Sequence, residues 1–421
     1  MHKLVVVGGQ PLRGRVRISG AKNAALAILS ATVMAGDIVV LDNVPDINDV
    51  RVMIKLIESL GAEVVWQASD SVRISPPEAV GSMPSYHQAK QLRASNLLLG
   101  PLLARFGKAE IPLPGGCNIG IRPMDLHFKG FAAMGAEIIL DKGCVRAYCK
   151  KLRGTRIYLD FPSVGATENI MMAACLAEGQ TVIENVAKEP EVVDLASFLN
   201  CLGAKVRGAG TDIIKIEGSR SLGGCMRYSV IPDRIEAGTF MVAAAATRGD
   251  VYLENIILRH LEPLRAKLKE AGVDVTEGED SLRVAVQGPL KPIDIKTLPY
   301  PGFPTDMQSQ MMAMLSTIPG TSLITENIFE NRFQVVDELK RMGARIKVEG
   351  RLAIIEGTDQ LHGTQVKATD LRAGAALVVA GLMAGGNTEI TNTKYIFRGY
   401  HEIDKKLRAL GADVRIVENG A

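Results

Sequence analysis

Residues 51–65, RVMIKLIESLGAEVV, carry the pattern that decides the fold: an apolar-periodic helix, a glycine, and then a β-rich stretch. Gly61 follows the last helical turn, where the backbone takes a positive φ that glycine adopts without steric cost. The same Gly-Ala or Gly-Val doublet recurs at spacings of 68 to 74 residues, beginning at Gly61, Gly135, Gly203, Gly272, Gly343 and Gly411. Six copies at a nearly constant spacing predict one supersecondary unit that is repeated six times.

The segments around these glycines are also alike. Three of them share a polar start, an apolar helix, a glycine turn and a strand ending near Glu-Asn or Asp-Asn: AKNAALAILSATVMAGDIVVLDNVP (21–45), ATENIMMAACLAEGQTVIENVAKEP (166–190) and TDMQSQMMAMLSTIPGTSLITENIF (305–329). A second helix then leads to the doublet. Each unit is therefore predicted to run strand, helix, strand, helix, strand, strand, which is an α/β fold.

The repeat also predicts where the chain divides. LVVVGGQPLRGRVRISGAKN (4–23) matches LAIIEGTDQLHGTQVKATDLR (352–372), so residues 1 to about 20 are expected to complete the sixth unit. The first domain is then 22–230, and the second is discontinuous, 1–21 with 231–421. A chain of 421 residues exceeds the ~250–300 residues that one core usually serves. We expect three repeats in each domain, with a hinge and a cleft where the chain crosses twice.

Composition excludes several classes of protein. Forty-nine basic and 46 acidic side chains leave a net charge of +3, which is no footprint for nucleic acid. The longest apolar stretches, such as AALVVAGLMA, fall short of the ~20 residues that span a bilayer. The start, MHKLVVVGGQ, breaks at Gly-Gly before a signal-peptide core develops. We expect a soluble cytoplasmic protein whose partners are small molecules.

Six cysteines show neither CxxC nor the spacing of a metal site, and a chain of this size does not need disulfides. Five of them are interpreted as packing residues: Cys144, Cys149, Cys175, Cys201 and Cys225. Cys117 differs, because it lies in the glycine-rich loop PLPGGCNIGIRPMDLH (112–127), five residues before Arg122. A thiol on such a loop near a cation suits a nucleophile or a proton donor. The alternative is an ordinary free cysteine in a turn.

Other candidate residues stand at the start of the first helix of each unit: Lys22 and Asn23, Arg93, Thr167 to Asn169, Asp233 and Arg234, Asp306, and Asp370 to Arg372. In a repeat fold these positions converge at one end of each domain. Helix N-termini already attract anions, so added cations predict a site for phosphate or carboxylate. Capping alone explains Asp233, Thr305 and Asp370, but it does not explain lysine or arginine at this position.

Two further arginines, Arg332 and Arg398, follow the third strand of their units. An arginine on a loop is most often merely solvated, and the matching positions of these two strengthen the functional alternative. His127 either orients a phosphate or caps a helix, and the sequence leaves both open. No ligand set for a metal or a redox cofactor is visible in the sequence, so we expect neither.

Several motifs together resemble the UDP-N-acetylglucosamine 1-carboxyvinyltransferase family of enolpyruvyl transferases over essentially the whole chain. They include SGAKNAALAILSA, the PGGC loop with RPMDLH, SVGATENIMMAACLAEG, YPGFPTDMQSQ, TDLRAGAALVVAGLMA and FRGYHEIDKKLRALGA. The resemblance implies an inside-out α/β barrel in each of two domains, with three βαβαββ repeats per domain. It also implies transfer of the enolpyruvyl group of phosphoenolpyruvate to the 3-hydroxyl of UDP-N-acetylglucosamine, the committed step of peptidoglycan synthesis.

The resemblance implies a catalytic set of Cys117, Asp306, Lys22 and Arg398. Asp306 would take the proton of the sugar hydroxyl, and Cys117 would protonate the methylene carbon and react with the epoxide antibiotic fosfomycin. The implied substrate contacts are Lys22, Asn23, Arg93, Arg122, Pro123, Met124, Asp125, Leu126, His127, Ser163, Val164, Gly165, Asp306, Ile328, Arg332, Asp370, Arg372 and Arg398. One departure is Asp160-Phe161-Pro162 before Ser163, where the family is expected to be more basic.

Three alternatives remain. A shikimate-type enolpyruvyl transferase carries a DKS-type first helix where this chain has AKNAA, and it lacks the cysteine loop. A sugar-nucleotide sensor without catalysis would not need the intact Lys22, Cys117, Asp306 and Arg398. An enzyme that processes nucleic-acid ends is disfavoured by the nearly neutral charge.

Overall fold

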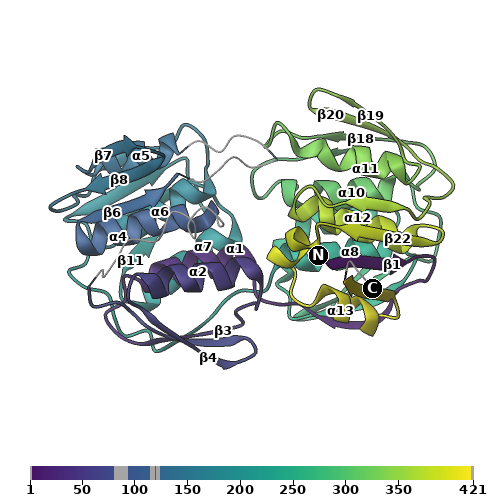
Figure 1. Ribbon diagram of the computed structural model, residues 1–421. Helices are drawn as coiled ribbons and strands as arrows, with labels where there is room; N and C mark the ends of the chain where they lie inside the picture. The colour runs from purple at the N-terminus through teal and green to yellow at the C-terminus, as the bar shows by residue number, and fades with distance from the viewer. Residues whose placement is uncertain (1, 80–92, 114–118, 120–123, 419–421) are drawn as a thin grey trace. The chain divides into compact units, whose positions relative to one another are not determined.

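The structure is a computed structural model that describes residues 2–79, 93–113, 119 and 124–418 (Figure 1). The chain forms two compact units. Unit 1 holds the described residues of Met1–Ser19, Cys117–Ile121 and Pro232–Ala421, and unit 2 those of Gly20–Gly116 and Arg122–Ile231. That each unit is a domain of three repeats, with limits near 22–230, stays a prediction.

The described elements of unit 2 alternate helices with short strands. In chain order they are α1 (Lys22–Thr32), β3 (Val39–Asp42), α2 (Asn48–Ser59), β4 (Glu63–Ala68), β5 (Ser71–Ser75), η1 (Arg93–Leu98), α4 (Leu99–Phe106), β6 (Lys108–Pro112), α5 (Asp125–Ala133), β7 (Glu137–Asp141), β8 (Cys144–Tyr148), β9 (Arg156–Tyr158), α6 (Val164–Ala174), β10 (Gln180–Glu184), α7 (Pro190–Cys201), β11 (Lys205–Arg207), β12 (Ile213–Glu217) and β13 (Arg227–Ser229).

Unit 1 follows the same order after two N-terminal strands. Its described elements are β1 (His2–Val7), β2 (Arg13–Arg17), α8 (Arg234–Ala246), β14 (Asp250–Glu254), η2 (Leu258–Leu261), α9 (Glu262–Glu270), β15 (Asp274–Glu277), β16 (Ser281–Ala285), β17 (Ile295–Lys296), η3 (Thr305–Met307), α10 (Gln308–Leu315), β18 (Thr321–Thr325), η4 (Arg332–Gln334), α11 (Val335–Arg341), β19 (Arg345–Glu349), β20 (Leu352–Glu356), β21 (Gln365–Lys367), α12 (Leu371–Met383), β22 (Asn387–Thr391), η5 (Thr393–Arg398), α13 (Ile403–Ala409) and β23 (Asp413–Glu418).

Each repeat builds one small sheet. The sheets of unit 2 have the strand orders β13-β3-β5-β4, β6-β8-β7 and β11-β12-β10-β9, and those of unit 1 the orders β15-β16-β14-β2, β17-β18-β20-β19 and β21-β22-β1-β23. In β9 to β12, for example, β9 pairs parallel with β10 across α6, while β11 and β12 form an antiparallel hairpin. The predicted order of elements is thereby confirmed in the third repeat, while the sheet of the second repeat has three strands among the described residues.

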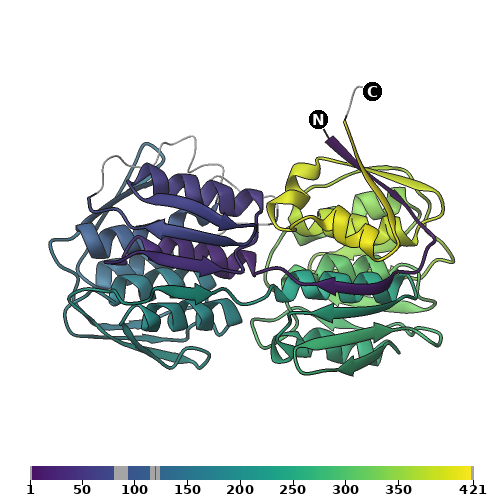
Figure 2. The ribbon, with the colours of Figure 1, turned by 90° about the horizontal axis from the view of Figure 1, so that it is seen from below.

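The N-terminal strands correct one expectation. β1 does complete the sixth sheet, pairing antiparallel with β22 and β23, so the two ends of the chain lie side by side (Figure 2). β2, however, pairs parallel with β14 and opens the fourth sheet. The prediction that residues 1 to about 20 all complete the sixth unit is therefore wrong for β2. The repeat is cyclic within unit 1, so β2 takes the place of the first strand of the next repeat.

Central helices and outer strands define the core of unit 1. Nearly every residue of α8, α10 and α12 is buried, as expected for helices that are apolar on all sides. The strands alternate instead, for example along β14, where Val251 and Leu253 are buried and Tyr252 is exposed, because only one face of each sheet packs on the helices. Figure 1 shows α8, α10 and α12 flanked by β1, β18 and β22. Each unit has its own cluster of buried apolar side chains.

The repeated Glu-Asn or Asp-Asn at the strand ends has a structural cause. Asn43, Asn185 and Asn255 have positive φ values of 55° to 60°. Their side-chain amides donate hydrogen bonds to the carbonyls of Val230 (2.8 Å), Leu159 (2.7 Å) and Ile18 (2.7 Å), respectively. The asparagine thus ends one strand in a left-handed turn and fastens the parallel neighbour of that strand.

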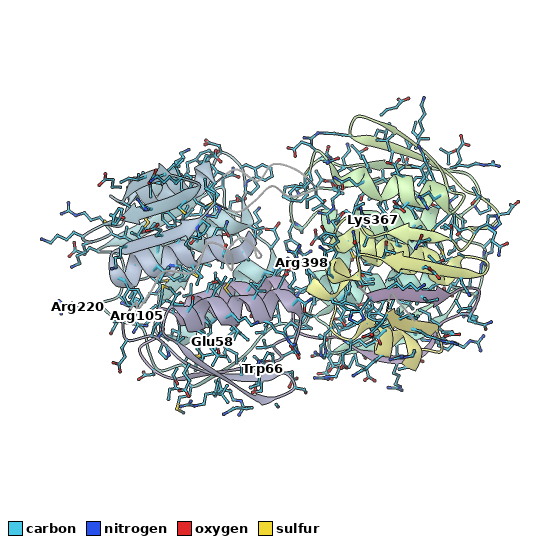
Figure 3. The ribbon with its side chains drawn as sticks, viewed as in Figure 1. Glu58, Trp66, Arg105, Arg220, Lys367 and Arg398 are labelled. Atoms are coloured by element: carbon cyan, nitrogen blue, oxygen red, sulfur yellow. A yellow bond between two sulfur atoms is a disulfide. The ribbon has the colours of Figure 1, made fainter. Side chains whose placement is uncertain are left out.

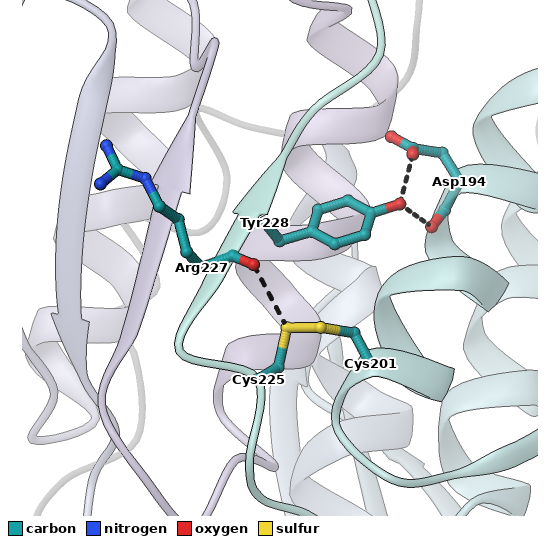
Figure 4. Close-up of a disulfide and its surroundings, with 5 residues drawn as sticks. All are labelled: Asp194, Cys201, Cys225, Arg227 and Tyr228. Carbon is teal, nitrogen blue, oxygen red and sulfur yellow. Dashed lines mark hydrogen bonds between the residues drawn. A yellow bond between two sulfur atoms is a disulfide. The ribbon is translucent and has the colours of Figure 1, made fainter.

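One cysteine expectation is wrong. Cys201, at the end of α7, and Cys225, before β13, form a disulfide with Cα atoms 5.1 Å apart (Figure 4). The segment between them returns to the end of α7, which brings together two thiols that are 24 residues apart in the sequence. Tyr228 lies beside this bridge and donates to Asp194 at 2.6 Å. Cys175 is buried, as expected, and burial raises the pKa of its thiol to about 12.

The six repeat glycines test the origin of the pattern. All have φ between 87° and 104°. A Cβ at Gly135 would meet no atom within 4 Å, so Gly135→Ala isolates the backbone cost, about 1 kcal/mol of unfolding free energy measured in urea. Gly288 is equally open and does not have a positive φ, so Gly288→Ala is the control and is expected to be neutral or slightly stabilising. Equal effects of the two changes would contradict this explanation.

Candidate functional site

The Asp306 carboxylate in unit 1 is held by two arginines. Arg332 Nη2 donates to Asp306 Oδ1 at 2.9 Å. Arg372 donates to Oδ2 from Nε at 3.1 Å and from Nη2 at 2.8 Å. The three side chains come from η3, η4 and the first turn of α12, all in unit 1. Three of the predicted site residues are therefore in direct contact.

Both guanidinium groups are removed from solvent. Arg332 is 2% exposed and Arg372 is 4% exposed, whereas the Asp306 side chain keeps 26% of its surface. Burial disfavours the charged form of Arg372, but the attraction of the Asp306 carboxylate outweighs it, so the pKa of Arg372 lies above its ordinary value. These buried cations are fixed charges that can interact with an anion without reorganising.

Glu326, which the sequence analysis did not single out, organises the two loops around Asp306. Its Oε2 accepts from the Thr305 hydroxyl at 2.9 Å, directly before Asp306. Its Oε1 accepts from the backbone N–H of Ile328 at 2.8 Å. The buried carboxylate thus ties the predicted contact Ile328 to the backbone that carries Asp306. The sequence feature that could have identified Glu326 is its position in the repeated Glu-Asn pattern.

Helix capping accounts for two of the candidate carboxylates. Asp233 Oδ1 accepts from the N–H groups of Ile235 and Glu236, and Asp370 Oδ1 accepts from those of Arg372 and Ala373. The capping interpretation is confirmed for both residues. It is wrong for Thr305, because its hydroxyl donates to Glu326 instead. A contact of Asp370 with substrate stays a prediction.

Arg398 ends η5 and is half-buried (Figure 3). Two residues later, Tyr400 accepts a hydrogen bond from Arg372 Nη1 at 3.3 Å. The segment that carries Arg398 is therefore attached to the guanidinium that holds Asp306.

In unit 2, Lys22 and Asn23 open α1. Lys22 Nζ lies 3.8 Å from Asp49 Oδ2, in the first turn of α2, and both side chains are largely buried. Asn23 is exposed. Asp49 was missed because nothing in the sequence pairs the first turns of two consecutive helices. An anion that binds Lys22 therefore competes with a carboxylate that is already present.

His127 and Asn169 connect three elements of unit 2. The Asn169 oxygen accepts from the Gly100 N–H at 2.7 Å, and its amide nitrogen donates to the Asn96 carbonyl at 2.7 Å. The same nitrogen lies 3.1 Å from His127 Nδ1. Because the amide is oriented by Gly100, His127 Nδ1 is the acceptor and Nε2 carries the proton. The helix-cap interpretation of His127 is therefore wrong, since α5 has no side-chain cap.

The N-terminal turn of α6 packs against this histidine. Ser163 caps the helix by accepting from Ala166 N–H at 3.4 Å, and Val164 and Gly165 follow it. A Cβ on Gly165 would lie 3.4 Å from His127 Cε1. Glu168 is buried, and its Oε1 has no hydrogen-bond partner among the described residues. Burial first, and then Glu191 and Glu189, raise the pKa of Glu168 well above its ordinary value.

The remaining predicted contacts are only partly covered. Met124 is buried directly before α5, Asp125 is exposed at its start, and Leu126 is half-buried. Arg93 begins η1. Cys117, Arg122 and Pro123 lie outside the described residues.

Neither a metal-binding cluster nor a membrane-spanning helix is found among the described residues. Between residues 2 and 418, apart from 80–92, 114–118 and 120–123, no group of three or more His, Cys, Asp or Glu side chains could hold a metal ion. Over these residues no helix has the length and apolar character that a bilayer span needs.

Comparison with known proteins decides the family. The model of EPSP synthase (3-phosphoshikimate 1-carboxyvinyltransferase) matches residues 6–407. UDP-N-acetylglucosamine 1-carboxyvinyltransferase 2 of Carboxydothermus hydrogenoformans is 57% identical over 421 residues, all of both chains. The chain belongs to the UDP-N-acetylglucosamine 1-carboxyvinyltransferase family of enolpyruvyl transferases. UDP-N-acetylglucosamine 1-carboxyvinyltransferase 1 of Caldanaerobacter subterraneus subsp. tengcongensis is 56% identical over 98% of this chain and 99% of its own.

Solved structures support the enolpyruvyl transferase fold. The enolpyruvyl transferase NikO from Streptomyces tendae superimposes with a TM-score of 0.90 at 26% identity, over 99% of both chains. EPSP synthase from Acinetobacter baumannii gives a TM-score of 0.78 at 20% identity, over 99% of this chain and 100% of its own. The predicted family and fold class, the inside-out α/β barrel, are therefore confirmed.

The His127 geometry predicts an ionisation behaviour. Burial lowers the pKa of His127 to about 4, although Asp125 opposes this. In the unfolded chain the imidazole takes up a proton as the pH falls below ~6.5. In the folded chain it does so only near pH 4. Above pH ~6.5 the imidazole therefore does not affect the free energy of unfolding. Between pH ~6.5 and pH 4 it lowers that free energy by about 3 kcal/mol in total.

Ring ¹⁵N chemical shifts during an NMR titration would measure this pKa and identify the tautomer. We expect an unprotonated Nδ1, and Asn169→Asp is expected to raise the pKa of His127 by adding a carboxylate. A His127 that titrates near ~6.5 in the folded wild type would contradict the assignment.

Proposed function

We propose that this chain transfers the enolpyruvyl group of phosphoenolpyruvate to the 3-hydroxyl of UDP-N-acetylglucosamine and releases phosphate. This reaction is the first committed step of peptidoglycan synthesis. The observation that carries the proposal is the 57% identity over the whole of both chains to a UDP-N-acetylglucosamine 1-carboxyvinyltransferase. Relatives with this activity in their names match at 52% to 57% identity, which favours it over the shikimate-type reaction.

The chemistry needs fixed positive charge and a base. Addition of the sugar hydroxyl forms an O–C bond at C2 of phosphoenolpyruvate while C3 gains a proton, giving a tetrahedral adduct that keeps the phosphate. Loss of a C3 proton and cleavage of the bond between C2 and the phosphate oxygen then release phosphate and restore the double bond, while the new bond to the sugar oxygen remains. In unit 1, the Asp306 carboxylate beside Arg332 and Arg372 supports these roles.

We assign the roles residue by residue as part of the proposal. Asp306 accepts the proton of the 3-hydroxyl, and Cys117 delivers the proton to C3. Arg372 and Arg398 hold the phosphate and carboxylate of phosphoenolpyruvate, with Lys22 and Arg122. The electrostatic support is clearest for Arg372, because its guanidinium is buried, charged and presented at the first turn of α12.

The nucleotide sugar is assigned mainly to unit 2. Helix N-termini favour anions and hydrogen-bond acceptors, so the first turns of α5 and α6 suit the uracil and diphosphate. His127 Nε2–H is a donor next to Gly165 in the same region. Phe161, two residues before Ser163, is exposed, and it supplies no positive charge for the diphosphate at the position where the family is expected to be more basic. The proposed contacts are Asn23, Arg93, Arg122, Pro123, Met124, Asp125, Leu126, Ser163, Val164, Gly165 and Ile328. We propose a cytoplasmic location, where these substrates are made.

Asp306→Asn tests the assigned base. The amide keeps the shape of the side chain but cannot accept the proton, so kcat for phosphate release is expected to fall by ~10²–10⁴-fold. Release of phosphate from phosphoenolpyruvate plus UDP-N-acetylglucosamine, followed by a coupled assay, is the measurement. Asp359→Asn, at an exposed position in unit 1, is the matched control and should keep full activity. Unchanged activity of Asp306→Asn would remove the base assignment, and an inactive wild type would favour the sensor alternative.

Cys117→Asp separates catalysis from reaction with the epoxide. An aspartic acid still donates a proton but does not open the epoxide as a thiolate does. We expect retained phosphate release and loss of the covalent fosfomycin adduct by mass spectrometry. Cys144→Ser, at a half-buried cysteine of β8, should be labelled as the wild type is. An adduct that persists in Cys117→Asp would place the reactive thiol elsewhere.

A further inference from the structure

Tyr400 is a buried polar residue to which the proposed function gives no role. It is 2% exposed and lies where three helices of unit 1 meet. Its hydroxyl contacts Thr239 of α8 at 2.9 Å, Gln310 of α10 at 3.4 Å and Arg372 of α12 at 3.3 Å. Packing alone does not explain a tyrosine here, because phenylalanine would fill nearly the same volume. The hydroxyl group, which contacts three central helices, needs a separate explanation.

The direction of each hydrogen bond follows from the donors. The Thr239 hydroxyl has one proton, which it donates to the Ile235 carbonyl at 2.8 Å, one helical turn earlier. In the contact between the two hydroxyls, Tyr400 must therefore be the donor. Its lone pairs then face Gln310 Nε2 and Arg372 Nη1, both of which can only donate. The chain of hydrogen bonds runs from Arg372 to Tyr400, Thr239 and the α8 backbone.

Burial keeps this chain in one protonation state. Burial first of all raises the pKa of Tyr400, although the positive charge of Arg372 opposes the shift. The phenol therefore remains a neutral donor to Thr239 near neutral pH. In addition, the Arg372 guanidinium carbon lies 5.7 Å from the centroid of the Tyr400 ring.

All three nitrogens of the Arg372 guanidinium are thereby fixed. Nη1 contacts Tyr400, while Nε and Nη2 contact Asp306 Oδ2. A planar fork held on two edges cannot rotate without breaking a hydrogen bond. The orientation of the Asp306 carboxylate consequently depends on a phenol on the opposite side of the guanidinium.

We propose that Tyr400, oriented by Thr239, is a positioning residue that fixes the Arg372 guanidinium and, through it, the Asp306 carboxylate for enolpyruvyl transfer. The inference rests on the proposed function. Tyr400 touches neither reacting group itself; it acts through Arg372.

Tyr400→Phe is the principal test. The ring remains, but Arg372 Nη1 loses its acceptor. We expect kcat to fall about tenfold and KM for phosphoenolpyruvate to rise severalfold, since a charge-assisted hydrogen bond is lost. KM for UDP-N-acetylglucosamine should change less, because its assigned contacts other than Asp306 and Ile328 lie in unit 2. Simple loss of folded protein would instead lower the apparent kcat and leave both KM values unchanged.

Thr239 supplies matched variants. Thr239→Val removes the acceptor that orients the phenol and should shift kcat and KM for phosphoenolpyruvate in the same direction, by less than Tyr400→Phe. Thr239→Ser keeps the hydroxyl and should retain wild-type constants. Because the two residues act in one chain, the double variant Thr239→Val with Tyr400→Phe should be no worse than Tyr400→Phe alone.

The outcomes separate this inference from the proposed function. A wild type that releases no phosphate would contradict the proposed function. An active wild type with unchanged constants in Tyr400→Phe would overturn the inference alone. The guanidinium ¹⁵N signals of Arg372 provide a readout that does not need turnover: a shift in Tyr400→Phe and in Thr239→Val supports the chain of hydrogen bonds, and no shift in either contradicts it.

Discussion

The pairing of the Asp306 carboxylate with two buried guanidinium groups is the constraint on which the candidate site of unit 1 depends. A buried arginine without a counter-charge is strongly unfavourable, so Arg332 and Arg372 require Asp306 as much as they orient it. The pairing joins the starts of three loops and helices that are 26 and 66 residues away in the chain. The backbone around them is held by Glu326 and by the Asp370 cap, so the charges are in place before a ligand arrives.

In unit 2, candidate site residues are also held in place by contacts with other elements. Asn169 fixes one tautomer of His127 and at the same time bonds the backbone of η1 and α4. Lys22, one of the cations assigned to phosphoenolpyruvate, already has a carboxylate neighbour in Asp49. In both units, therefore, a cation at the tip of a central helix is balanced by an aspartate at the start of another element. An anionic substrate that binds Lys22 exchanges one negative partner for another, which limits the net cost of desolvation.

The repeat explains why such positions could be identified before the structure. Glycine after the second helix of each unit and asparagine after the second strand are dictated by backbone conformation. The glycine has a positive φ in all six copies, and an asparagine with a positive φ recurs at Asn43, Asn185, Asn255 and Asn392. Hence the element order and the helix tips, with Asp306 and Arg372 among them, followed from the pattern. The same pattern misassigned β2, because two equivalent ends of a cyclic repeat look alike in sequence. It also missed Cys201–Cys225, because proximity of two thiols 24 residues apart depends on how the segment between them returns.

The sequence by itself determined the periodic features: six units, their strand and helix order, the capping carboxylates Asp233 and Asp370, and the residue types of the candidate site. These are local, since a turn with positive φ or a helix N-terminus selects its residue through a few neighbouring backbone atoms. Only the tertiary structure decided which side chains pair: Arg332 with Asp306, Lys22 with Asp49, Asn169 with His127, and Tyr400 with Arg372. Such contacts depend on the packing of helices from different repeats, and one repeat carries no information on which neighbour its side chains will meet.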